Sequence, residues 1–433
     1  MEEKTMQQRI EETLFTPVLG EYDVIVAGGG PAGIGAAIAA GRHGARVLVI
    51  EHFSCLGGMW TSGLVNPLFD YENKGGIVQE IVDKINDAGM NDHSGHMYTF
   101  DMEYMKLLLD RLVAGAGADV LFHTNVVRPV MRDGAICGVV VENKGGRAAY
   151  MGKIVIDCTG DGDIAVRAGA PYTMGRASDG ACQPMTLMYK ISHMDYVQRY
   201  PNPLGKKTEL FHIMKAGAEA AGLHDYDFNF DQPCLLKLPG LHTGVMQMTH
   251  MRGYNGTDPL DLSKAEMEGR ERVWEAIHFL KTYCDAFKNV QLDQTAAMIG
   301  VRETRRIRGE YEISFADMQA GRRFPDGFAT CAFGVDIHQP TGKSQENDIP
   351  PIRPYQLPYR SLVPLQVENL LVAGRCISGC FEAHASYRVT GDCVAMGQAA
   401  GTAAAMALQK KVSPREMDGA EVARAMERDG ARL

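Results

Sequence analysis

The clearest hydrophobic pattern of the chain lies near its N-terminus, in DVIVAGGGPAGIGAAIAAGRHGARVLVIE at 23–51. An apolar run at 24–27 predicts a buried strand, the alanine-rich stretch after it predicts a helix, and a second apolar run at 47–50 predicts another strand. Continuous apolar strands that alternate with helices are typical of a parallel sheet covered on both faces. The pattern therefore predicts an α/β fold that contains a Rossmann-like βαβ unit.

Three glycines separate the first predicted strand from the helix. Gly28, Gly30 and Gly33 have G-x-G-x-x-G spacing. In this spacing the first glycine allows a tight turn, the second lets the backbone approach a pyrophosphate, and the third lets the helix pack on the sheet. Glu51 follows 18 residues after Gly33, where a carboxylate accepts hydrogen bonds from a ribose diol. The unit predicts a dinucleotide site, and a glycine-rich turn without a ligand is the alternative.

Two later stretches predict further strands that end in glycine-containing turns. They are IVIDCTGDGDIA at 154–165 and NLLVAGRCISG at 369–379. Neither has the glycine spacing of a second nucleotide-binding unit, so we expect one large cofactor shared by distant parts of the chain. A helix predicted at 388–408 carries small residues that permit close packing. These small residues are Gly397, Ala400, Gly401 and Ala404.

The segment between these ends has a different character. From about 168 to 357 it alternates strand-like stretches such as MTLMYKIS and GVMQMTH with turn clusters such as YNGTDP. It also contains one stretch of helical period at 271–287. We interpret the segment as a mixed α+β substrate domain. On one face of the predicted helix we expect core residues, namely Trp274, Ile277, Cys284 and Phe287.

Composition and charge narrow the choice of partners. The chain has 433 residues, which predicts about two or three domain-sized units. A net charge of −9 and a pI near 5.8 argue against a nucleic-acid partner or an anionic membrane surface, because both favour basic patches. We therefore expect a small-molecule partner, and the sequence leaves open whether the chain forms a homo-oligomer.

The sequence shows no signal for export or membrane insertion. Its nearest approach to an apolar span, 394–408, is interrupted by Gln398 and is shorter than the roughly 20 residues that a membrane helix needs. The start, MEEKTMQQRIEETLF, lacks a basic region followed by an apolar core. Ten cysteines without a dense regular spacing fit reduced thiols. We therefore expect a cytoplasmic protein.

These segments resemble the FAD-dependent oxidoreductase family of the glutathione-reductase-like flavoprotein superfamily. The resemblance rests on LGG at 56–58, on IDCTGDGD at 156–163 and on NLLVAGR at 369–375 ahead of a Gly/Ala-rich helix. It extends from about residue 23 to 408 and implies FAD as the cofactor. Further similar stretches are IGVRETRRIRGEYEIS at 299–314, VDIH at 335–338 and LPYRSLVP at 357–364.

The resemblance also implies a division of the chain. A Rossmann-like FAD-binding domain would be formed by two parts of the sequence that enclose the substrate domain. The expected segments are an N-terminal extension at 1–20, the first part of the FAD-binding domain at 21–167, the substrate domain at 168–357, the second part of the FAD-binding domain at 358–410 and a C-terminal tail at 411–433.

Cofactor contacts follow from the same resemblance. Glu51 and the glycines of the first turn would hold the ADP half of FAD, Val126 would meet the adenine, and Gly57 and Gly58 would pass under the pyrophosphate and the flavin. The later turns and the start of the terminal helix would reach the pyrophosphate, the ribityl chain and the flavin. The full expected set is Gly28, Gly30, Pro31, Ala32, Gly33, Glu51, His52, Gly57, Gly58, Met59, Thr61, Val126, Thr159, Gly160, Asp161, Gly374, Arg375, Gly391, Asp392 and Val394.

The stretch SCLGGMWTSG at 54–63 places Cys55 beside the expected flavin seat. Disulfide reductases of the superfamily carry two cysteines close together near this position, so that one thiolate can meet the flavin. No second cysteine follows Cys55 here. We therefore interpret Cys55 as a small packing residue, and a redox or covalent-flavin role is the alternative.

Candidate catalytic residues must reach the flavin. His338 ends VDIH after a predicted strand, and His384 and Arg388 in EAHASYR precede the terminal helix. A histidine there can take a substrate proton while a hydride passes to the flavin, and an arginine can hold a carboxylate by two parallel hydrogen bonds. Either histidine could instead be structural. Tyr359 and Arg360 are further candidates for the cavity wall.

Other polar residues receive structural interpretations. The arginines of VRETRRIRGEYE alternate with acids, which favours a network of salt bridges over substrate binding. We expect no metal site, because His93 and His96 lie in a polar loop and Cys376 and Cys380 are too far apart for a C-x-x-C ligand pair. The arginines concerned are Arg302, Arg305 and Arg306.

The hypothesis that follows is an FAD-dependent enzyme that moves two electrons between flavin and a small organic molecule. Two alternatives are an FAD-binding subunit that passes electrons within a redox complex and a nucleotide-binding scaffold without activity. The intact glycine pattern and Glu51 disfavour the scaffold. The sequence leaves open the substrate, the direction of the reaction and the separate electron donor or acceptor.

Overall fold

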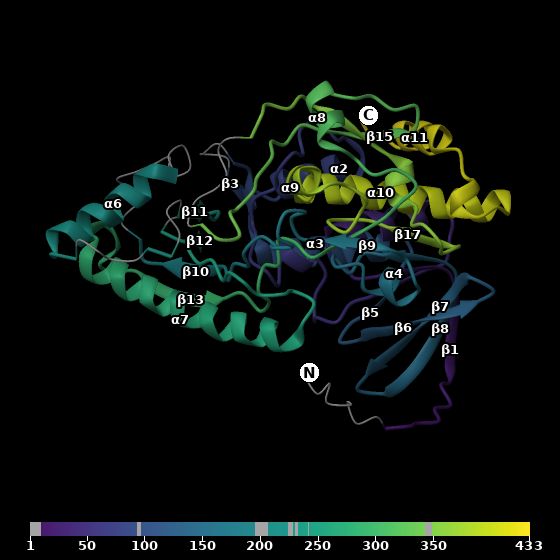
Figure 1. Cartoon of the computed structure of the whole chain (residues 1–433), viewed down its shortest axis with the longest axis horizontal. Helices are drawn as coiled ribbons and strands as arrows, with labels where there is room; N and C mark the ends of the chain where they lie inside the picture. The colour runs from purple at the N-terminus through teal and green to yellow at the C-terminus, as the bar shows by residue number, and fades with distance from the viewer. Residues whose placement is uncertain are drawn as a thin grey trace, which may run out of the picture.

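The fold is given by a computed structural model of the chain (Figure 1). A large sheet and the helices around it form one side of the molecule, and a smaller group of strands and two helices forms the other. The structure describes residues 10–92, 97–194, 207–223, 228–229, 233–240, 242–342 and 349–433.

The large sheet has seven strands and contains the predicted βαβ unit. Strands β5, β2, β1 and β8 pair in parallel, and Val24 of β1 lies opposite Val47 of β2. Residues 24–27 and 47–50 are buried, as expected for strands covered on both faces. The predicted α/β fold is therefore confirmed. The seven strands are β1 (Val18–Ala27), β2 (Val47–Ile50), β5 (Asp119–Leu121), β6 (Asn125–Arg132), β7 (Ala135–Asn143), β8 (Gly146–Asp157) and β17 (Leu370–Val372).

Strand β8 joins distant parts of the sequence. Its residues 146–151 pair with β7 in antiparallel fashion, and β6 continues the sheet beyond β7. Its residues 155–157 pair in parallel with β17. Strand β17 thus brings the C-terminal part of the chain back to the large sheet, where it lies beside β8.

Helices α1 (Pro31–Arg42) and α10 (Thr390–Lys410) pack closely together, and α10 runs along the main sheet in Figure 1. A Cβ added to Gly397 would lie 1.9 Å from the carbonyl oxygen of Ala32, and one added to Gly401 would lie 2.2 Å from that of Ala36. Only glycine fits at these two contacts, because a real Cβ cannot approach backbone so closely. The expected role of the small residues of α10 is confirmed.

The remaining elements around the large sheet are short or cover its edges. Strands β9 and β14, β15 and β16, and β3 and β4 form three separate antiparallel pairs. The strands are β3 (Asn91–Asp92), β4 (Thr99–Phe100), β9 (Tyr172–Met174), β14 (Arg305–Ile307), β15 (Gly327–Cys331) and β16 (Tyr355–Pro358); the helices are α2 (Gly76–Asp87), α3 (Met102–Gly115), α4 (Asp163–Arg167), α8 (Phe315–Ala320), α9 (Phe381–Tyr387) and α11 (Gly419–Arg428); the short 3-10 turns are η1 (Gly58–Trp60), η3 (Tyr359–Leu362) and η4 (Pro414–Glu416).

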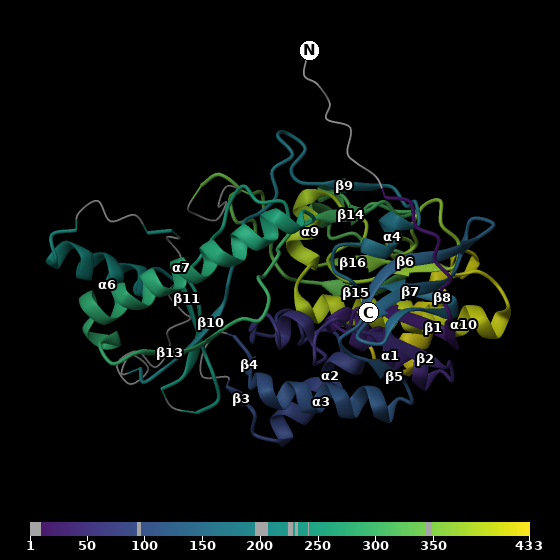
Figure 2. The same cartoon turned by 90° about the horizontal axis from the view of Figure 1, so that it is seen from below.

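A second sheet lies in the middle segment of the sequence. Its strands have the order β11-β12-β10-β13, and all of its pairings are antiparallel. Figure 2 shows this sheet with α6 and α7 to one side of the main sheet. The elements are β10 (Tyr189–Ser192), β11 (Cys234–Lys237), β12 (Gly244–Gln247), β13 (Gln291–Thr295), α6 (Lys207–Ala220), α7 (Pro259–Tyr283) and η2 (Asp285–Phe287).

The predicted helical stretch at 271–287 corresponds to the second half of α7 and the turn η2, and one of its four expected core residues is not buried. Trp274 is 62% exposed, whereas Ile277, Cys284 and Phe287 are buried as expected. The buried stripe of α7 runs through Gly269, Val273 and Ile277 at intervals of four residues, so Trp274 is rotated out of it by one position.

The described residues include no helix with the length and apolarity that crossing a membrane requires.

Candidate functional site

The main cavity of the site has a volume of about 480 Å³ and lies at the carboxyl ends of four parallel strands. Ligands of open α/β sheets bind at this edge, where the strands end in loops. Residues from the turns after β1, β2, β8 and β17 all line the cavity. The members of the expected cofactor set that line it are Gly28, Gly30, Pro31, Ala32, Glu51, His52, Gly58, Met59, Val126, Thr159, Gly160, Asp161, Gly374 and Arg375.

The three glycines of the first turn occupy different surroundings. A Cβ on Gly28 would lie 2.5 Å from the carbonyl oxygen of Cys158, and Gly28 has a φ of +102°. A Cβ on Gly33 would lie 1.9 Å from the carbonyl oxygen of Gly28. A Cβ on Gly30 would have no atom within 4 Å, although Gly30 lines the cavity. Two glycines therefore permit packing, and Gly30 leaves the cavity surface bare.

Glu51 is held at the cavity by the backbone of the neighbouring loops. Its carboxylate accepts hydrogen bonds from the N–H groups of Gly29 at 2.8 Å and Phe53 at 2.9 Å, and it lies 3.0 Å from Nδ1 of His52. Burial opposes ionisation of Glu51, but the contacts with His52 and Phe53 outweigh it and hold the pKa below its ordinary value. The carboxylate is therefore ionised at neutral pH and fixed in position.

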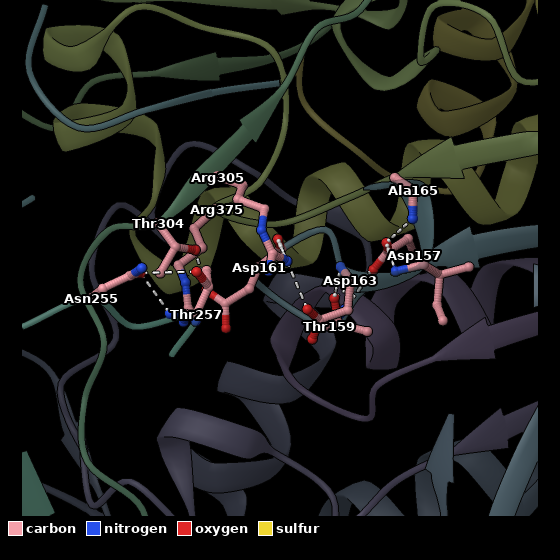
Figure 3. Close-up of polar contacts among 11 residues, drawn as sticks. Asp157, Thr159, Asp161, Asp163, Ala165, Asn255, Thr257, Thr304, Arg305 and Arg375 are labelled. Carbon is pink, nitrogen blue, oxygen red and sulfur yellow. Dashed lines mark hydrogen bonds and ion pairs between the residues drawn. The ribbon is translucent and has the colours of Figure 1, made fainter. Parts of the chain in front are cut away.

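The turn after β8 is organised by Asp157 (Figure 3). This buried carboxylate accepts hydrogen bonds from the Thr159 hydroxyl at 2.7 Å and from the N–H groups of Ile164 at 2.9 Å and Ala165 at 2.8 Å. Burial raises the pKa of Asp157 in spite of these hydrogen bonds. Asp157 thereby fixes the path of the chain that brings Thr159 and Gly160 to the cavity wall.

The turns after β8 and β17 are tied together by an ion pair. Asp161 accepts a hydrogen bond from Arg375 at 2.8 Å and another from the hydroxyl of Thr304 (Figure 3). A Cβ on Gly160 would lie 3.0 Å from the guanidinium carbon of Arg375. Arg375 therefore lies flat against a bare backbone position at the cavity.

Six members of the expected cofactor set do not line the cavity. The hydroxyl of Thr61 donates to the carbonyl of Leu56 at 2.7 Å, and a Cβ on Gly391 would lie 2.4 Å from the carbonyl oxygen of Phe69. Thr61 and Gly391 therefore face other segments of the backbone. The six are Gly33, Gly57, Thr61, Gly391, Asp392 and Val394.

Asp392 takes part in a separate buried network. Nζ of Lys74 lies 2.8 Å from a carboxylate oxygen of Asp392 and 2.8 Å from one of Asp70. Burial raises the pKa of Asp392 to about 8. In the described residues Asp70, Cys331 and Asp392 form a group whose ligand atoms lie within 4.8 Å of one another, but the Lys74 ammonium already supplies a cation to its two carboxylates. His93 and His96 lie outside the described residues.

A second cavity of about 350 Å³ adjoins the first. Apolar and polar side chains both contribute to its wall. Residues that line both cavities are Met59, Val301, Arg375, Arg388 and Thr390. The polar residues that line the second cavity are Thr186, Gln247, Arg302, Asp336, His338, Arg375, Arg388 and Thr390.

Two arginines reach the second cavity from different segments. Arg388, at the end of α9, donates to the carbonyl of Asp336 at 2.8 Å and lies 3.4 Å from its carboxylate. Arg302 donates at 2.7 Å to the carbonyl of Pro184 and at 2.7 Å to the hydroxyl of Thr186. Burial, and then the charge of Arg388, lower the pKa of Arg302 to about 9.

The salt-bridge interpretation of the neighbouring arginines is confirmed for two of them. Arg305 pairs with Asp163 at 2.8 Å, and Arg306 pairs with Glu303. Arg302 differs, because the hydrogen bonds that it makes go to neutral groups and its guanidinium lines the second cavity. The alternation of charges around these arginines does not distinguish Arg302 from Arg305 and Arg306.

His338 also lines the second cavity. Its Nδ1 lies 2.8 Å from Nε2 of His250, and its Nε2 lies 3.4 Å from the carboxylate of Asp336. Burial, followed by the charge of Arg302, lowers the pKa of His338 to about 4. The imidazole is therefore neutral at pH 7, and its two ring nitrogens face His250 and Asp336.

His384 has a different environment. It is fully buried and lines neither cavity, and neither of its ring nitrogens has a hydrogen-bond partner among the described residues. Burial lowers its pKa well below the ordinary value. Tyr359 and Arg360 also line neither cavity, since Tyr359 donates to the carbonyl of Pro414 and Arg360 pairs with Asp326.

Cys55 lies between β2 and η1 and lines neither cavity. Its sulfur is 3.5 Å from the Ser62 hydroxyl and 3.7 Å from that of Thr61. All ten cysteines of the chain are unpaired thiols. The surroundings of Cys55 thus favour packing, as the sequence predicts.

The first cavity fits a dinucleotide. Gly30 presents bare backbone, Glu51 is ionised, and three polar atoms at the junction of the two cavities are buried without a hydrogen-bond partner among the described residues. Such atoms are costly unless a ligand satisfies them. They are Nε of Arg375, Nε of Arg388 and Oγ1 of Thr390.

Two curated relatives match part of the chain. It is 31% identical over 152 residues to the thiamine thiazole synthase of Methanococcus aeolicus, which is 32% of this chain and 55% of that protein. It is 31% identical over 144 residues to the digeranylgeranylglycerophospholipid reductase of Methanospirillum hungatei, which is 30% of this chain and 35% of that protein. The chain therefore spans about half, or less, of the relatives that it matches.

Solved structures and a family model extend the comparison. A geranylgeranyl bacteriochlorophyll reductase-like protein of Thermoplasma acidophilum is 14% identical, with 94% of this chain and 83% of that chain covered and a TM-score of 0.47. The model of a family described as FAD dependent oxidoreductase matches residues 23–426. This family-model match confirms the expected resemblance and the expected cofactor, and the chain belongs to the FAD-dependent oxidoreductase family.

Proposed function

We propose that the protein transfers a hydride between FAD, held in the first cavity, and a small organic molecule, held in the second. The observation that carries the proposal is the junction of the two cavities, where five residues line both. A cofactor and a substrate on the two sides of this junction would be in contact. Bound FAD supplies a two-electron acceptor or donor, and the residues of the chain supply the rest of the chemistry.

The residues around the first cavity would bind and position the cofactor. The ionised carboxylate of Glu51 would accept hydrogen bonds from the ribose of the cofactor. Gly30 carries no side chain, so a phosphate of the cofactor could approach the backbone there closely. Arg375 and the N-terminus of α10 reach the junction with the second cavity. The helix N-terminus and the guanidinium both favour negative charge there.

His338 is our candidate for proton transfer. Its neutral imidazole lines the substrate cavity and is oriented by His250 and Asp336. A base in this position can accept a proton from a substrate hydroxyl or amine as the hydride leaves the adjacent carbon. Arg388 would orient the substrate, because its guanidinium lines both cavities.

The second cavity also helps to decide between an enzyme and an electron-transfer subunit, which is the alternative function. An electron-transfer subunit needs a contact for a redox partner but no enclosed space for a small molecule. The second cavity therefore favours the enzyme. The ten unpaired thiols support the further proposal that the protein works in a reducing compartment such as the cytoplasm.

Anaerobic reduction of the bound flavin tests the proposal. We would mix the holoprotein with a panel of small acids, polyols and amines and follow the loss of flavin absorbance. We expect at least one compound to bleach the flavin within seconds. If no compound does so and only a protein partner reduces the flavin, the electron-transfer function replaces ours.

The two histidine candidates can be separated with that compound. His338→Gln should slow flavin reduction by about 100-fold or more, because general base catalysis contributes roughly 10²–10⁴. His384→Gln should alter the melting temperature more than the rate, since His384 is buried and lines neither cavity. The opposite pattern would assign proton transfer to His384.

A further inference from the structure

The charges around the second cavity do not balance. Three arginines and a single carboxylate, Asp336, line it. Arg375 is paired with Asp161 of the first cavity, and Asp336 lies beside Arg388. The hydrogen bonds of Arg302 go to the carbonyl of Pro184 and the hydroxyl of Thr186, which carry no charge. Arg302 thus has only neutral hydrogen-bond partners, and the one carboxylate whose charge acts on it, Asp336, also lies beside Arg388.

The N-terminus of α10 adds to this positive region. Val389, its N-cap residue, and Thr390, its first residue, line the second cavity, and the helix is 21 residues long. A helix N-terminus favours an anion through its free amide groups and its dipole. The hydroxyl of Thr390 and Nε of Arg388 are both buried without a hydrogen-bond partner among the described residues. Both residues line both cavities, so each group can donate to an acceptor on either side of the junction.

Most of the remaining cavity wall is apolar, and its polar members are Thr186, Gln247 and His338. Side chains from the loop after β2, from the second sheet and from the segment after β15 enclose the space. Such a wall accepts hydrocarbon and excludes further charged groups, because an unpaired charge there would be desolvated. The apolar wall residues are Met59, Val65, Pro67, Phe69, Met97, Met188, Cys234, Leu236, Val301, Phe333 and Val389.

We propose that the substrate is a carboxylate with an apolar body, held at its carboxylate by Arg302 and Arg388. This inference rests on the proposed function, since it concerns the substrate of the same site. A planar guanidinium can hold a carboxylate by two parallel hydrogen bonds, and two guanidinium groups from separate segments fix its orientation. A neutral molecule would leave Arg302 with neutral hydrogen-bond partners and only the charge of Asp336, which lies beside Arg388 as well.

Binding also connects the two arginines to His338. The positive charges of Arg302 and Arg388 both lower the pKa of His338. A carboxylate bound between the arginines offsets these charges, so the pKa of His338 rises when the substrate is present. The substrate itself would then make the imidazole a stronger base.

Paired acids and amides test the proposal without requiring turnover. We would titrate the FAD-replete protein with hexanoate and hexanamide, and with phenylacetate and phenylacetamide, and measure binding by calorimetry and by the change in flavin absorbance. Each pair differs in charge and hardly in shape. We expect each acid to bind at least about tenfold more tightly than its amide.

Variants locate the charge that is responsible. Arg302→Gln should weaken binding of the acids by about tenfold or more and leave the amides almost unchanged. Arg302→Lys should recover part of the loss, because lysine keeps the charge but lacks the planar fork. Arg308→Gln is the matched control in the same segment, since Arg308 is exposed and lines neither cavity.

The outcomes separate this inference from the proposed function. Equal binding of acid and amide, no binding of either acid at millimolar concentration, or unchanged binding in a folded, FAD-replete Arg302→Gln protein would overturn the carboxylate assignment. Flavin reduction by a neutral compound that is insensitive to Arg302→Gln would do the same and leave hydride transfer intact. Selective binding of acids without flavin reduction by any organic compound would support the assignment and count against the proposed function.

Discussion

Replacing Gly30 by alanine should separate cofactor binding from folding. Gly30 precedes α1 with φ −71° and ψ −174°, which alanine adopts without strain. The added Cβ would have no protein atom within 4 Å. We therefore expect the apoprotein to fold normally, with a free energy of unfolding unchanged or raised by up to about 1 kcal/mol.

The same methyl group should weaken FAD binding. It would project at the cavity wall where the bare backbone permits a phosphate to approach. If the phosphate loses one charge-assisted hydrogen bond to the backbone, the loss is about 1.5–3 kcal/mol, or roughly ten- to 150-fold in the dissociation constant. Titration of apoprotein with FAD, followed by quenching of flavin fluorescence, measures this constant.

Two further glycine variants complete the comparison. Gly115→Ala, at an exposed position with open space around it, controls for the general effect of alanine and should bind FAD normally. Gly33→Ala should unfold readily or fail to accumulate, because its Cβ would lie 1.9 Å from the carbonyl oxygen of Gly28. A Gly30→Ala protein that binds FAD like the wild type, or that does not fold, would refute the reasoning.

Three other predictions concern His338, Cys55 and the electron donor. His338 has a pKa of about 4 in the folded protein and about 6.5 in the unfolded protein. Between these pH values only the unfolded state binds the proton, so the free energy of unfolding falls as the pH drops from 6.5 towards 4. Between pH 7 and pH 5 it should account for a loss of about 2 kcal/mol in unfolding free energy, and urea titrations of the wild type and His338→Gln that show the same pH dependence would contradict this. Cys55→Ser should keep nearly full activity, because the sulfur lines neither cavity, and a 100-fold loss with FAD still bound would restore a redox role. NADH and NADPH should reduce the flavin slowly, since the sequence offers one nucleotide-binding unit, and rapid bleaching by micromolar NADPH in a stopped-flow instrument would show otherwise.

The βαβ unit could be predicted because its signal is local. The apolar runs at 24–27 and 47–50 fix the buried strands, and the spacing of Gly28, Gly30 and Gly33 reports a single turn. The return of β17 to the sheet was predictable for the same reason, since its apolar run ends at a glycine.

The direction of individual side chains could not be predicted in this way. Asp392 stands at the start of α10, near the junction of the cavities, but its carboxylate turns away and pairs with Lys74. Trp274 has a helical spacing to Ile277, but the buried stripe passes one position beside it. Both outcomes depend on which neighbouring element a helix face meets, and the sequence of one helix does not contain that information.

The second cavity was also beyond prediction from the sequence. Arg302 comes from the segment before β14, Arg388 from the end of α9, and His250 from the segment after β12. They come together only in the folded chain, where the second sheet lies to one side of the main sheet (Figure 2) and residues from distant segments line one cavity. In the sequence Arg302 is indistinguishable from Arg305 and Arg306, which form ion pairs.

The most direct test of the account is the identity and amount of the flavin in the purified protein. We predict a yellow protein that releases close to one FAD per chain on denaturation, because Glu51 and the first βαβ unit are suited to the AMP half that FMN lacks. Chromatography of the released flavin distinguishes the two cofactors. Recovery of FMN, or a colourless protein that does not bind added FAD, would contradict the central claim.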